Sequence, residues 1–93
     1  MESYLAMIME IAIDYDIADA PHRQLAAWIR ERIVSGEFPP GRRIPSETEL
    51  VQMSGVARGT SRRAVALLRD ESYVVTVGGR GSYVRPREDW PQG

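Results

Sequence analysis

The sequence has no cysteine and only one histidine, His22, among its 93 residues. The absence of cysteine excludes disulfides, thiol catalysis and cysteine-ligated zinc. A single histidine cannot build a multi-histidine metal site and argues against a Ser-His-Asp triad. No apolar run approaches the roughly 20 residues that cross a bilayer, and the apolar segment 4–9 lacks the basic start of a secretory signal. We therefore expect a soluble cytoplasmic domain that is not an enzyme, without catalytic residues, cofactor or metal.

Lysine is also absent, so all 12 cationic residues are arginines, and they are unevenly placed. Residues 1–20 hold five acids and no cation, whereas residues 21–93 hold every arginine and the remaining eight of the 13 acids. The net charge of −1 therefore conceals an acidic start and a basic remainder. Guanidinium groups suit guanine edges and phosphates, which indicates a nucleic-acid partner. A GC-rich genome that favours arginine codons explains the absence of lysine equally well.

Residues 1–20 form an N-terminal extension whose apolar pattern is ambiguous. Leu5 and Ile8 follow helical spacing, whereas residues 10–15 alternate as a strand does. We expect a frayed or helical start followed by a short strand at 10–15. The apolar side chains, including Ile11 and Ile13, either pair with a second copy of the chain or cover the core of their own domain.

Three helices are predicted between residues 21 and 70. Pro21 is well placed at a first helical position, and Gly36 can supply a left-handed C-cap, which together predict a helix over 21–35. Ser46 and Glu49 have the spacing of a capping box, so a short second helix begins near residue 47 and ends at Gly55. A third helix follows over about 58–70. Two helices joined by a short glycine-containing turn are typical of a helix-turn-helix.

A hairpin and a tail complete the chain. Residues 73–77 and 82–84 are β-branched and aromatic, and a glycine-rich tip lies between them. Residues 86–93 contain two prolines and are expected to form a loose, flexible tail. The predicted fold is mainly α with a small β-hairpin, a winged helix-turn-helix of three helices and a two-stranded wing over residues 21–85.

Several short motifs occur in a fixed order along this region: Gln24-Leu25-Ala26, Ile33 to Gly41, Ile44-Pro45-Ser46-Glu47, Gly55-Val56 with Arg58 and Arg62, and Gly79 to Val84. In this combination the chain resembles the DNA-binding domain of the GntR family of bacterial transcription regulators. The resemblance implies sequence-specific binding of double-stranded DNA by a nucleoid-associated homodimer on a palindromic operator, with a repressor as the expected regulator. No membrane partner is expected, and no small-molecule effector is expected to bind this chain.

The third helix is expected to enter the major groove. Arg58 and Arg62 are four residues apart and share one helix face, with Thr60 beside them, so these three residues are the expected base contacts. The glycine-tipped wing, residues Gly79, Arg80 and Gly81, is expected to reach the minor groove, as the resemblance implies. The expected contacts to the DNA backbone are Ser46, Glu47, Thr48, Ser61, Arg63 and Arg42, with Arg43 as a further candidate.

The chain departs from the family pattern at several positions. The family usually has arginine where Thr48 stands, which puts one DNA contact in doubt. Ala57 cannot cap the third helix as a serine or threonine would, and Gly59 lowers helix propensity. Ser54 and Ser61 stand where apolar residues are common, and Ser72 replaces a usual glycine.

Family members normally continue into an effector-binding domain. Because this chain stops at Gly93, it is either a piece of a longer protein or a short member without that domain. Two alternatives to a transcription regulator remain: a winged helix used for protein interaction or assembly, and an accessory DNA-binding protein of replication or recombination. A protein interface would favour aromatic residues over arginine at its centre.

Overall fold

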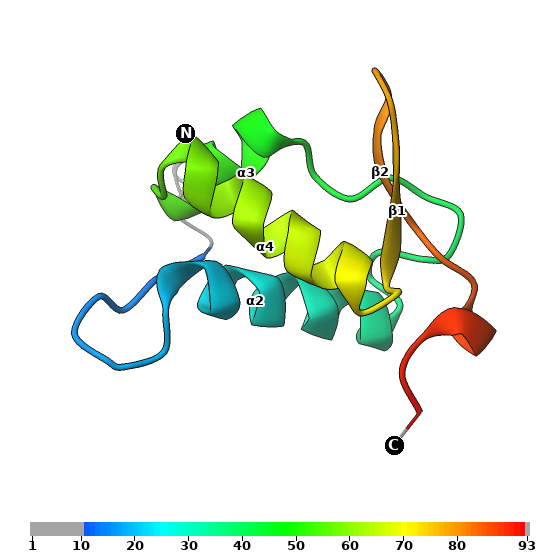
Figure 1. The fold of residues 1–93 in the computed structure, drawn as a ribbon, viewed down its shortest axis with the longest axis horizontal. Helices are drawn as coiled ribbons and strands as arrows, with labels where there is room; N and C mark the ends of the chain where they lie inside the picture. The colour runs from blue at the N-terminus through cyan, green and yellow to red at the C-terminus, as the bar shows by residue number, and fades with distance from the viewer. Residues whose placement is uncertain (1–10, 93) are drawn as a thin grey trace.

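The computed structural model describes residues 11–92. These residues form three α-helices, a two-stranded antiparallel hairpin and a short 3-10 helix (Figure 1). In chain order they are α2 (Pro21–Ser35), α3 (Glu47–Ser54), α4 (Arg58–Asp70), β1 (Val74–Val77), β2 (Gly81–Val84) and η1 (Arg87–Asp89). Within the described part of the chain, no helix is long and apolar enough to cross a membrane.

Helix α2 forms where local signals begin and end it. Pro21 occupies the first helical position after Ala20, which offers no side-chain cap. Gly36 ends the helix in the left-handed conformation with φ 90°, and its N–H donates to the Ile33 carbonyl at 3.1 Å. Glycine adopts this conformation without the penalty that a Cβ imposes. The predicted bounds of the first helix are therefore confirmed.

Helices α3 and α4 form the predicted helix-turn-helix. The capping box is present: the Glu49 N–H donates to the Ser46 hydroxyl at 3.1 Å, and the Ser46 N–H donates to the Glu49 carboxylate at 2.8 Å. Gly55 ends α3 with φ 76°, and Val56 is buried in the turn. Ala57 precedes α4 without a side-chain cap, as its methyl group dictates. The bounds predicted for the third helix are confirmed.

The core lies between α2, α4 and the base of the hairpin. Its fully buried apolar side chains come from these three elements and from α3, which contributes Leu50: Leu25, Ala26, Ile29, Ile33, Leu50, Ala64, Leu68 and Val74. Helices α2 and α4 lie side by side, and α3 crosses one end of the pair (Figure 1). This packing leaves one side of α4 facing away from the core.

The predicted hairpin is confirmed and forms a wing, defined here as residues 74–84. Val74 pairs with Val84 at its buried base, and Val77 pairs with Gly81 at its tip. The loop before α3 lies along β2, because the Ile44 N–H donates to the Ser82 carbonyl at 2.9 Å and the Val84 N–H donates to the Arg42 carbonyl at 2.9 Å. The base of the wing is therefore tied to the rest of the domain.

The strand predicted at residues 10–15 is wrong for the described residues 11–15, which adopt no strand. Ile11 is 4% exposed, and its N–H donates to the Met53 carbonyl at the end of α3 at 3.1 Å. Ile13 packs against the same core. These two residues therefore cover their own domain, whereas Leu5 and Ile8 lie outside the described residues.

The tail expected at residues 86–93 has an anchor within its described part, residues 86–92. A turn of 3-10 helix follows Pro86. Trp90 is 9% exposed, its indole N–H donates to the Arg85 carbonyl at 2.9 Å, and its ring lies 5.9 Å from that of Tyr73. Burial of an aromatic ring together with its polar N–H explains why this segment packs on the domain. The expectation of a loose tail overlooked this tryptophan.

Candidate nucleic-acid interface

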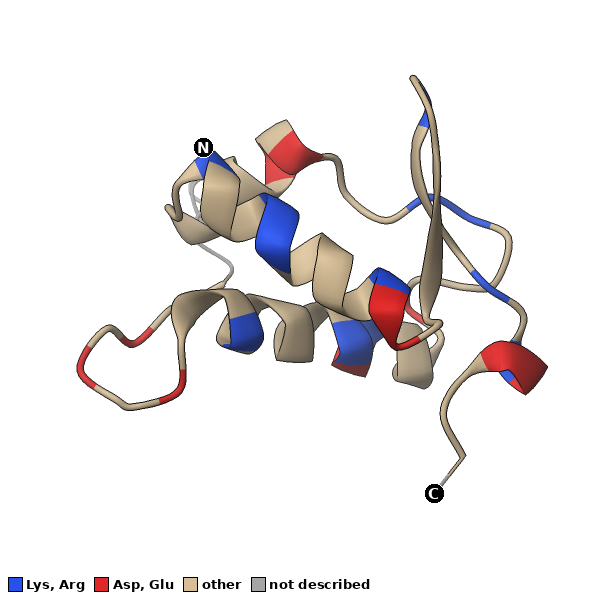
Figure 2. Ribbon diagram, viewed as in Figure 1, with Lys and Arg blue, Asp and Glu red and all other residues tan. Residues whose placement is uncertain are grey.

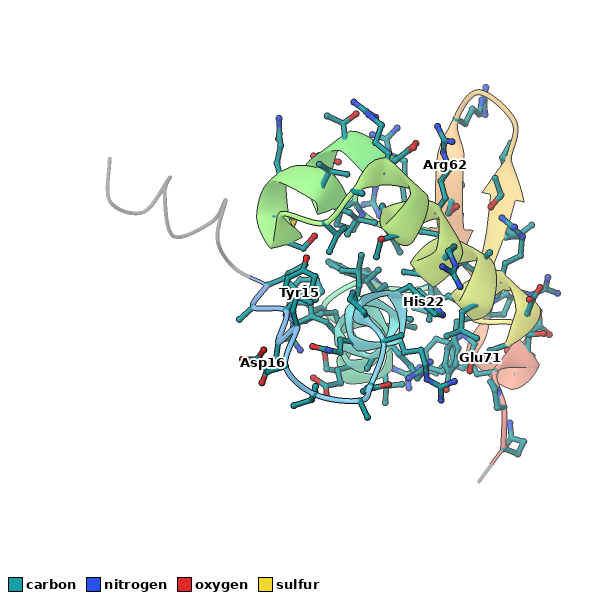
Figure 3. The ribbon with its side chains drawn as sticks, turned by 60° about the vertical axis from the view of Figure 1, so that its left-hand side comes forward. Tyr15, Asp16, His22, Arg62 and Glu71 are labelled. Atoms are coloured by element: carbon teal, nitrogen blue, oxygen red, sulfur yellow. The ribbon has the colours of Figure 1, made fainter. Side chains whose placement is uncertain are left out.

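Helix α4 has one buried face and one arginine-rich face. Ser61, Ala64 and Leu68 are fully buried on the first. Arg58 and Arg62 are exposed on the second, with side chains that are 59% and 71% accessible. Figure 3 shows Arg62 on the side of the molecule that carries the wing, away from Tyr15 and Asp16. The cationic side chains at the start of α4 are therefore available to a partner.

The three further residues predicted on this helix differ in exposure. Arg63 is exposed, and Thr60 is half-buried. Ser61, however, is fully buried, and its hydroxyl has no hydrogen-bond partner. A side chain at the helix-core boundary cannot reach a phosphate while α4 keeps this orientation. The structure gives the Ser61 side chain no access to a partner, and its contact with the DNA backbone stays a prediction from the sequence.

Glu47, at the first position of α3, faces the arginines of α4. The Arg62 Nε donates to the two carboxylate oxygens of Glu47 at 2.8 and 3.2 Å. The Arg58 guanidinium lies 4.0 Å from the same carboxylate. The carboxylate therefore orients the Arg62 guanidinium and lies near that of Arg58. The Glu47 carboxylate is negatively charged and repels phosphate. If this residue contacts a phosphate, the contact is made by its backbone N–H at the start of α3.

The start of α3 holds the predicted backbone contacts Ser46 and Thr48, both exposed. The Ser46 hydroxyl accepts the Glu49 N–H at 3.1 Å. The hydrogen bonds from the Ser46 backbone and side chain hold the pKa of the Glu49 carboxyl below its ordinary value. The Glu49 carboxylate is therefore occupied in capping and does not compete for the arginines.

The tip of the wing places Arg80 between two glycines with positive φ. Gly79 has φ 75° and Gly81 has φ 117°, and the Arg80 N–H closes the turn on the Val77 carbonyl at 3.0 Å. Arg80 is exposed. The Arg43 guanidinium donates to the Arg80 carbonyl at 3.2 Å, so the tip is also tied to the loop before α3. Arg42 is exposed beside it.

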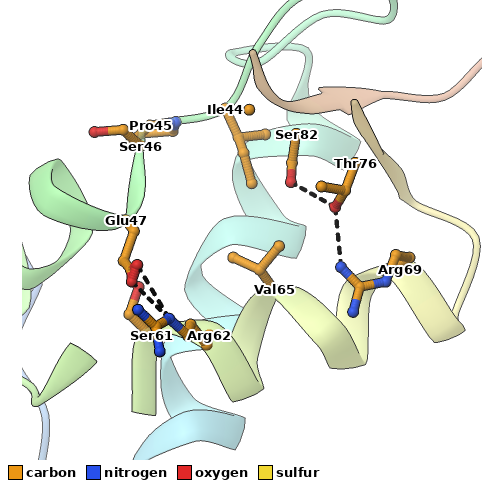
Figure 4. A pocket seen from close by; sticks show the side chains of 11 residues that line it. Ile44, Pro45, Ser46, Glu47, Ser61, Arg62, Val65, Arg69, Thr76 and Ser82 are labelled. Carbon is orange, nitrogen blue, oxygen red and sulfur yellow. Dashed lines mark hydrogen bonds and ion pairs between the residues drawn. The ribbon is translucent and has the colours of Figure 1, made fainter. Parts of the chain in front are cut away.

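A groove of about 380 Å³ separates α4 from the wing (Figure 4). We call it the α4–wing groove. Its apolar floor includes Ile44 and Val65, and the side chains that line it with polar groups are Ser46, Glu47, Ser61, Arg62, Arg69, Thr76 and Ser82. It thus connects the start of α3, the exposed face of α4 and the inner face of the wing.

Arg69 is the charged groove residue that sequence reasoning missed, together with its neighbours Thr76 and Ser82. Its guanidinium donates to the Thr76 hydroxyl at 2.9 Å, and that hydroxyl lies 2.9 Å from the Ser82 hydroxyl (Figure 4). Arg69 follows Arg62 by two turns of helix, so its position on the same face was available from spacing. Its pairing with a strand was not available from spacing.

Charged residues of both signs lie over the whole molecule, α2 included, but two concentrations stand out (Figure 2). Arginines lie on α4, on the wing and on the loop before α3, whereas three aspartates gather in the loop that precedes α2. These aspartates are Asp14, Asp16 and Asp19, all of them exposed. The arginine-rich side has the charge expected of a surface that meets a polyanion.

The chain matches the model of a family described as bacterial regulatory proteins, gntR family, over residues 21–84. It is 39% identical over 64 residues to the mannosyl-D-glycerate transport/metabolism system repressor MngR of Escherichia coli (strain K12), covering 69% of this chain and 27% of that protein. It is 43% identical over 68 residues to the histidine utilization repressor of Klebsiella aerogenes, covering 72% of this chain and 28% of that protein. The chain therefore spans less than a third of the length of these curated relatives.

Solved structures share the fold. YtrA from Sulfolobus acidocaldarius, a GntR-family transcription factor, superposes with a TM-score of 0.73 at 35% identity, covering 86% of this chain and 82% of that one. The DNA-binding domain of AraR, solved in complex with operator ORX1, superposes with a TM-score of 0.72 at 30% identity, covering 78% of this chain and 93% of that one. The fold predicted from the sequence, a winged helix-turn-helix, is therefore confirmed.

Proposed function

Because this chain belongs to the GntR family of bacterial regulatory proteins, we propose that it binds double-stranded DNA sequence-specifically and regulates transcription. The observation that carries the proposal is the exposed face of α4, where Arg58 and Arg62 project opposite the buried residues. An α-helix fits the major groove, and residues in its first turns reach the base edges. The solved complex of the AraR DNA-binding domain with an operator supports this use of the fold.

Base reading is assigned to Arg58, Arg62 and Thr60. An arginine that donates two hydrogen bonds to guanine O6 and N7 contributes about 1–3 kcal/mol of discrimination. Glu47 supports this role, because its carboxylate already holds the Arg62 guanidinium in place before DNA arrives. Ordering a long side chain in advance reduces the entropy lost on binding.

Contacts with the sugar-phosphate backbone are assigned to groups on either side of α4. They are the Ser46 and Thr48 side chains, the Glu47 backbone, Arg63 and Arg42. The wing carries Arg80 toward the adjacent minor groove, where the glycines on either side allow close approach of the backbone. Phosphate contacts position the protein without reading the sequence. These backbone contacts therefore fix the register in which α4 meets the bases.

We propose that the protein acts as a repressor, as the names of the two curated relatives suggest, and that it works in the cytoplasm as a homodimer. A two-fold symmetric dimer presents two α4 helices to an inverted repeat whose half-sites lie about one helical turn apart. Residues 1–10 lie outside the described residues, and their deletion tests whether they hold the two copies together. Loss of the dimer in sedimentation after this deletion would place the dimer contact in that segment.

Selection from a pool of randomised duplexes at physiological salt tests the proposal. Non-specific binding is weak under this condition, so a sequence-specific protein enriches its own site. We expect an enriched inverted repeat. Retention of all sequences alike, with affinity that falls steeply with salt, would contradict sequence-specific binding and leave only a non-specific DNA-binding role.

A further inference from the structure

The wing is a small element that needs external contacts to hold its orientation. It consists of two four-residue strands, and an isolated two-stranded hairpin is marginally stable in water. Its base is fixed, since Val74 and Val84 are buried. Its outer half, residues 76–82, extends past the core and carries the exposed Arg80. The contacts that hold residues 76–82 therefore determine where Arg80 lies relative to α4.

Besides the backbone hydrogen bond from the Ile44 N–H to the Ser82 carbonyl, two arginine side chains contact the outer half of the wing from two different elements. Arg69, near the end of α4, donates to the Thr76 hydroxyl on β1 at 2.9 Å, and Thr76 is bonded in turn to Ser82 on β2. Arg43, in the loop before α3, donates to the Arg80 carbonyl at the tip at 3.2 Å. One contact thus ties the wing to α4, and the other ties it to the loop that runs along β2.

The backbone geometry fits this bracing. Thr76 and Ser82 are paired in register, so their side chains share one face of the hairpin, and both line the α4–wing groove. A Cβ on Gly81 would lie 2.9 Å from the Arg43 Cδ, so the stem of Arg43 passes close beneath the tip. Among the hydrogen bonds of residues 11–92, the Arg69–Thr76 bond is the one that joins β1 to α4.

We propose that Arg69 and Arg43 are positioning residues that hold the wing at a fixed angle to α4, so that Arg80 meets the DNA beside the bases that α4 reads. The inference rests on the proposed function. Arg69 acts through Thr76 and not through a phosphate of its own. Arginine suits this role better than lysine, because its planar guanidinium directs its hydrogen bonds rigidly.

The test combines Arg69→Met, Thr76→Val and the double variant, with Thr76→Ser as the matched control. Thr76→Val removes the acceptor without changing charge, and Arg69→Met keeps an unbranched stem. We expect each single variant to weaken binding to the selected duplex about threefold to tenfold, the tenfold loss being about 1.4 kcal/mol. The double variant loses no more than the larger single loss, because both changes break one contact. Thr76→Ser retains wild-type affinity.

A phosphate contact by Arg69 would give a different pattern. Arg69→Met would then lower the slope of log affinity against log salt by about 0.9, and Thr76→Val would bind as the wild type does. That result would overturn the proposal.

Backbone NMR of the free protein separates this inference from the proposed function. Heteronuclear NOE values of the Gly78, Gly79 and Gly81 amides report wing order on the picosecond-to-nanosecond timescale without DNA. We expect them to fall in Arg69→Met, Thr76→Val and Arg43→Met, with the thermal midpoint little changed. Unchanged NOE values would overturn the proposal even if the wild type binds DNA. If the NOE values fall in the variants but the wild type binds no duplex, the positioning role of Arg69 and Arg43 is supported and the proposed function is contradicted.

Discussion

The Arg62 Nε donates to both carboxylate oxygens of Glu47, at 2.8 and 3.2 Å, across the junction between α3 and α4. The Arg62 side chain is 71% accessible and that of Glu47 is 30% accessible. An ion pair so exposed contributes little to folding stability, about 0–1 kcal/mol. Its importance therefore lies in where it holds the guanidinium.

Glu47→Gln tests this arrangement. The amide removes a negative charge from the interface and holds Arg62 less firmly, so we expect affinity for random duplex to rise and the ratio of specific to random affinity to fall. Titration of both duplexes at several salt concentrations measures the change. Weaker binding to random duplex would show that Glu47 does not oppose phosphate contacts.

Ser61→Ala is expected to stabilise the domain and leave DNA binding unchanged. The Ser61 hydroxyl is buried without a partner, and an unsatisfied buried polar group costs about 1–3 kcal/mol. Urea denaturation measures the gain. Ser54→Ala is the control, because the Ser54 hydroxyl donates to the Leu50 carbonyl at 2.6 Å and its loss removes a made hydrogen bond. A large loss of DNA affinity in Ser61→Ala would instead support the contact between Ser61 and the DNA backbone that the sequence predicts.

Sequence and structure agree most closely where local chemistry decides the outcome. The bounds of α2 and α4 follow from Pro21, Gly36 and apolar spacing, and the start of α3 follows from its capping box. The signals that set these bounds act within a few residues of each other.

The features that sequence reasoning missed join residues far apart in the chain. Arg62 and Glu47 are 15 residues apart, and Ile11 bonds to Met53 across the domain. Trp90 lies in a proline-containing segment whose composition indicates a loose tail, yet its ring has a place beside Tyr73. No periodicity encodes such contacts, because they depend on how the elements pack. The burial of Ser61 could be inferred from its position, because it lies on the same face of α4 as the buried residues Ala64 and Leu68, but its polar side chain argued against burial.

Ser72→Gly is expected to raise the free energy of unfolding by about 1 kcal/mol. Ser72 follows α4 with φ 67°, and a residue with a Cβ pays about 1–2 kcal/mol in this conformation, partly offset by the greater freedom of glycine in the unfolded chain. For a domain of this size the thermal midpoint should rise by about 4–8 °C. Ser72→Ala keeps the strain and serves as the control. An equal gain in both variants would contradict a backbone cause.

The capping box should make stability depend on pH in the acidic range. The pKa of Glu49 is lowered in the folded state, so its contribution is fully present above the ordinary carboxyl pKa and is lost as the pH falls through the lower folded value. Glu49→Gln keeps a side-chain acceptor for the Ser46 N–H but cannot titrate. Thermal unfolding across this range should show a smaller loss of stability in Glu49→Gln than in the wild type. Parallel curves would place the acid sensitivity elsewhere.

The most direct measurement compares Arg58→Ala with Arg63→Ala on the selected duplex and on a scrambled one across a range of salt concentrations. Loss of the base-reading Arg58 should cost about 1–3 kcal/mol on the selected duplex and much less on the scrambled one. Loss of Arg63 should weaken both duplexes alike and lower the salt slope by about 0.9. Equal losses on the two duplexes in Arg58→Ala would contradict base reading by α4.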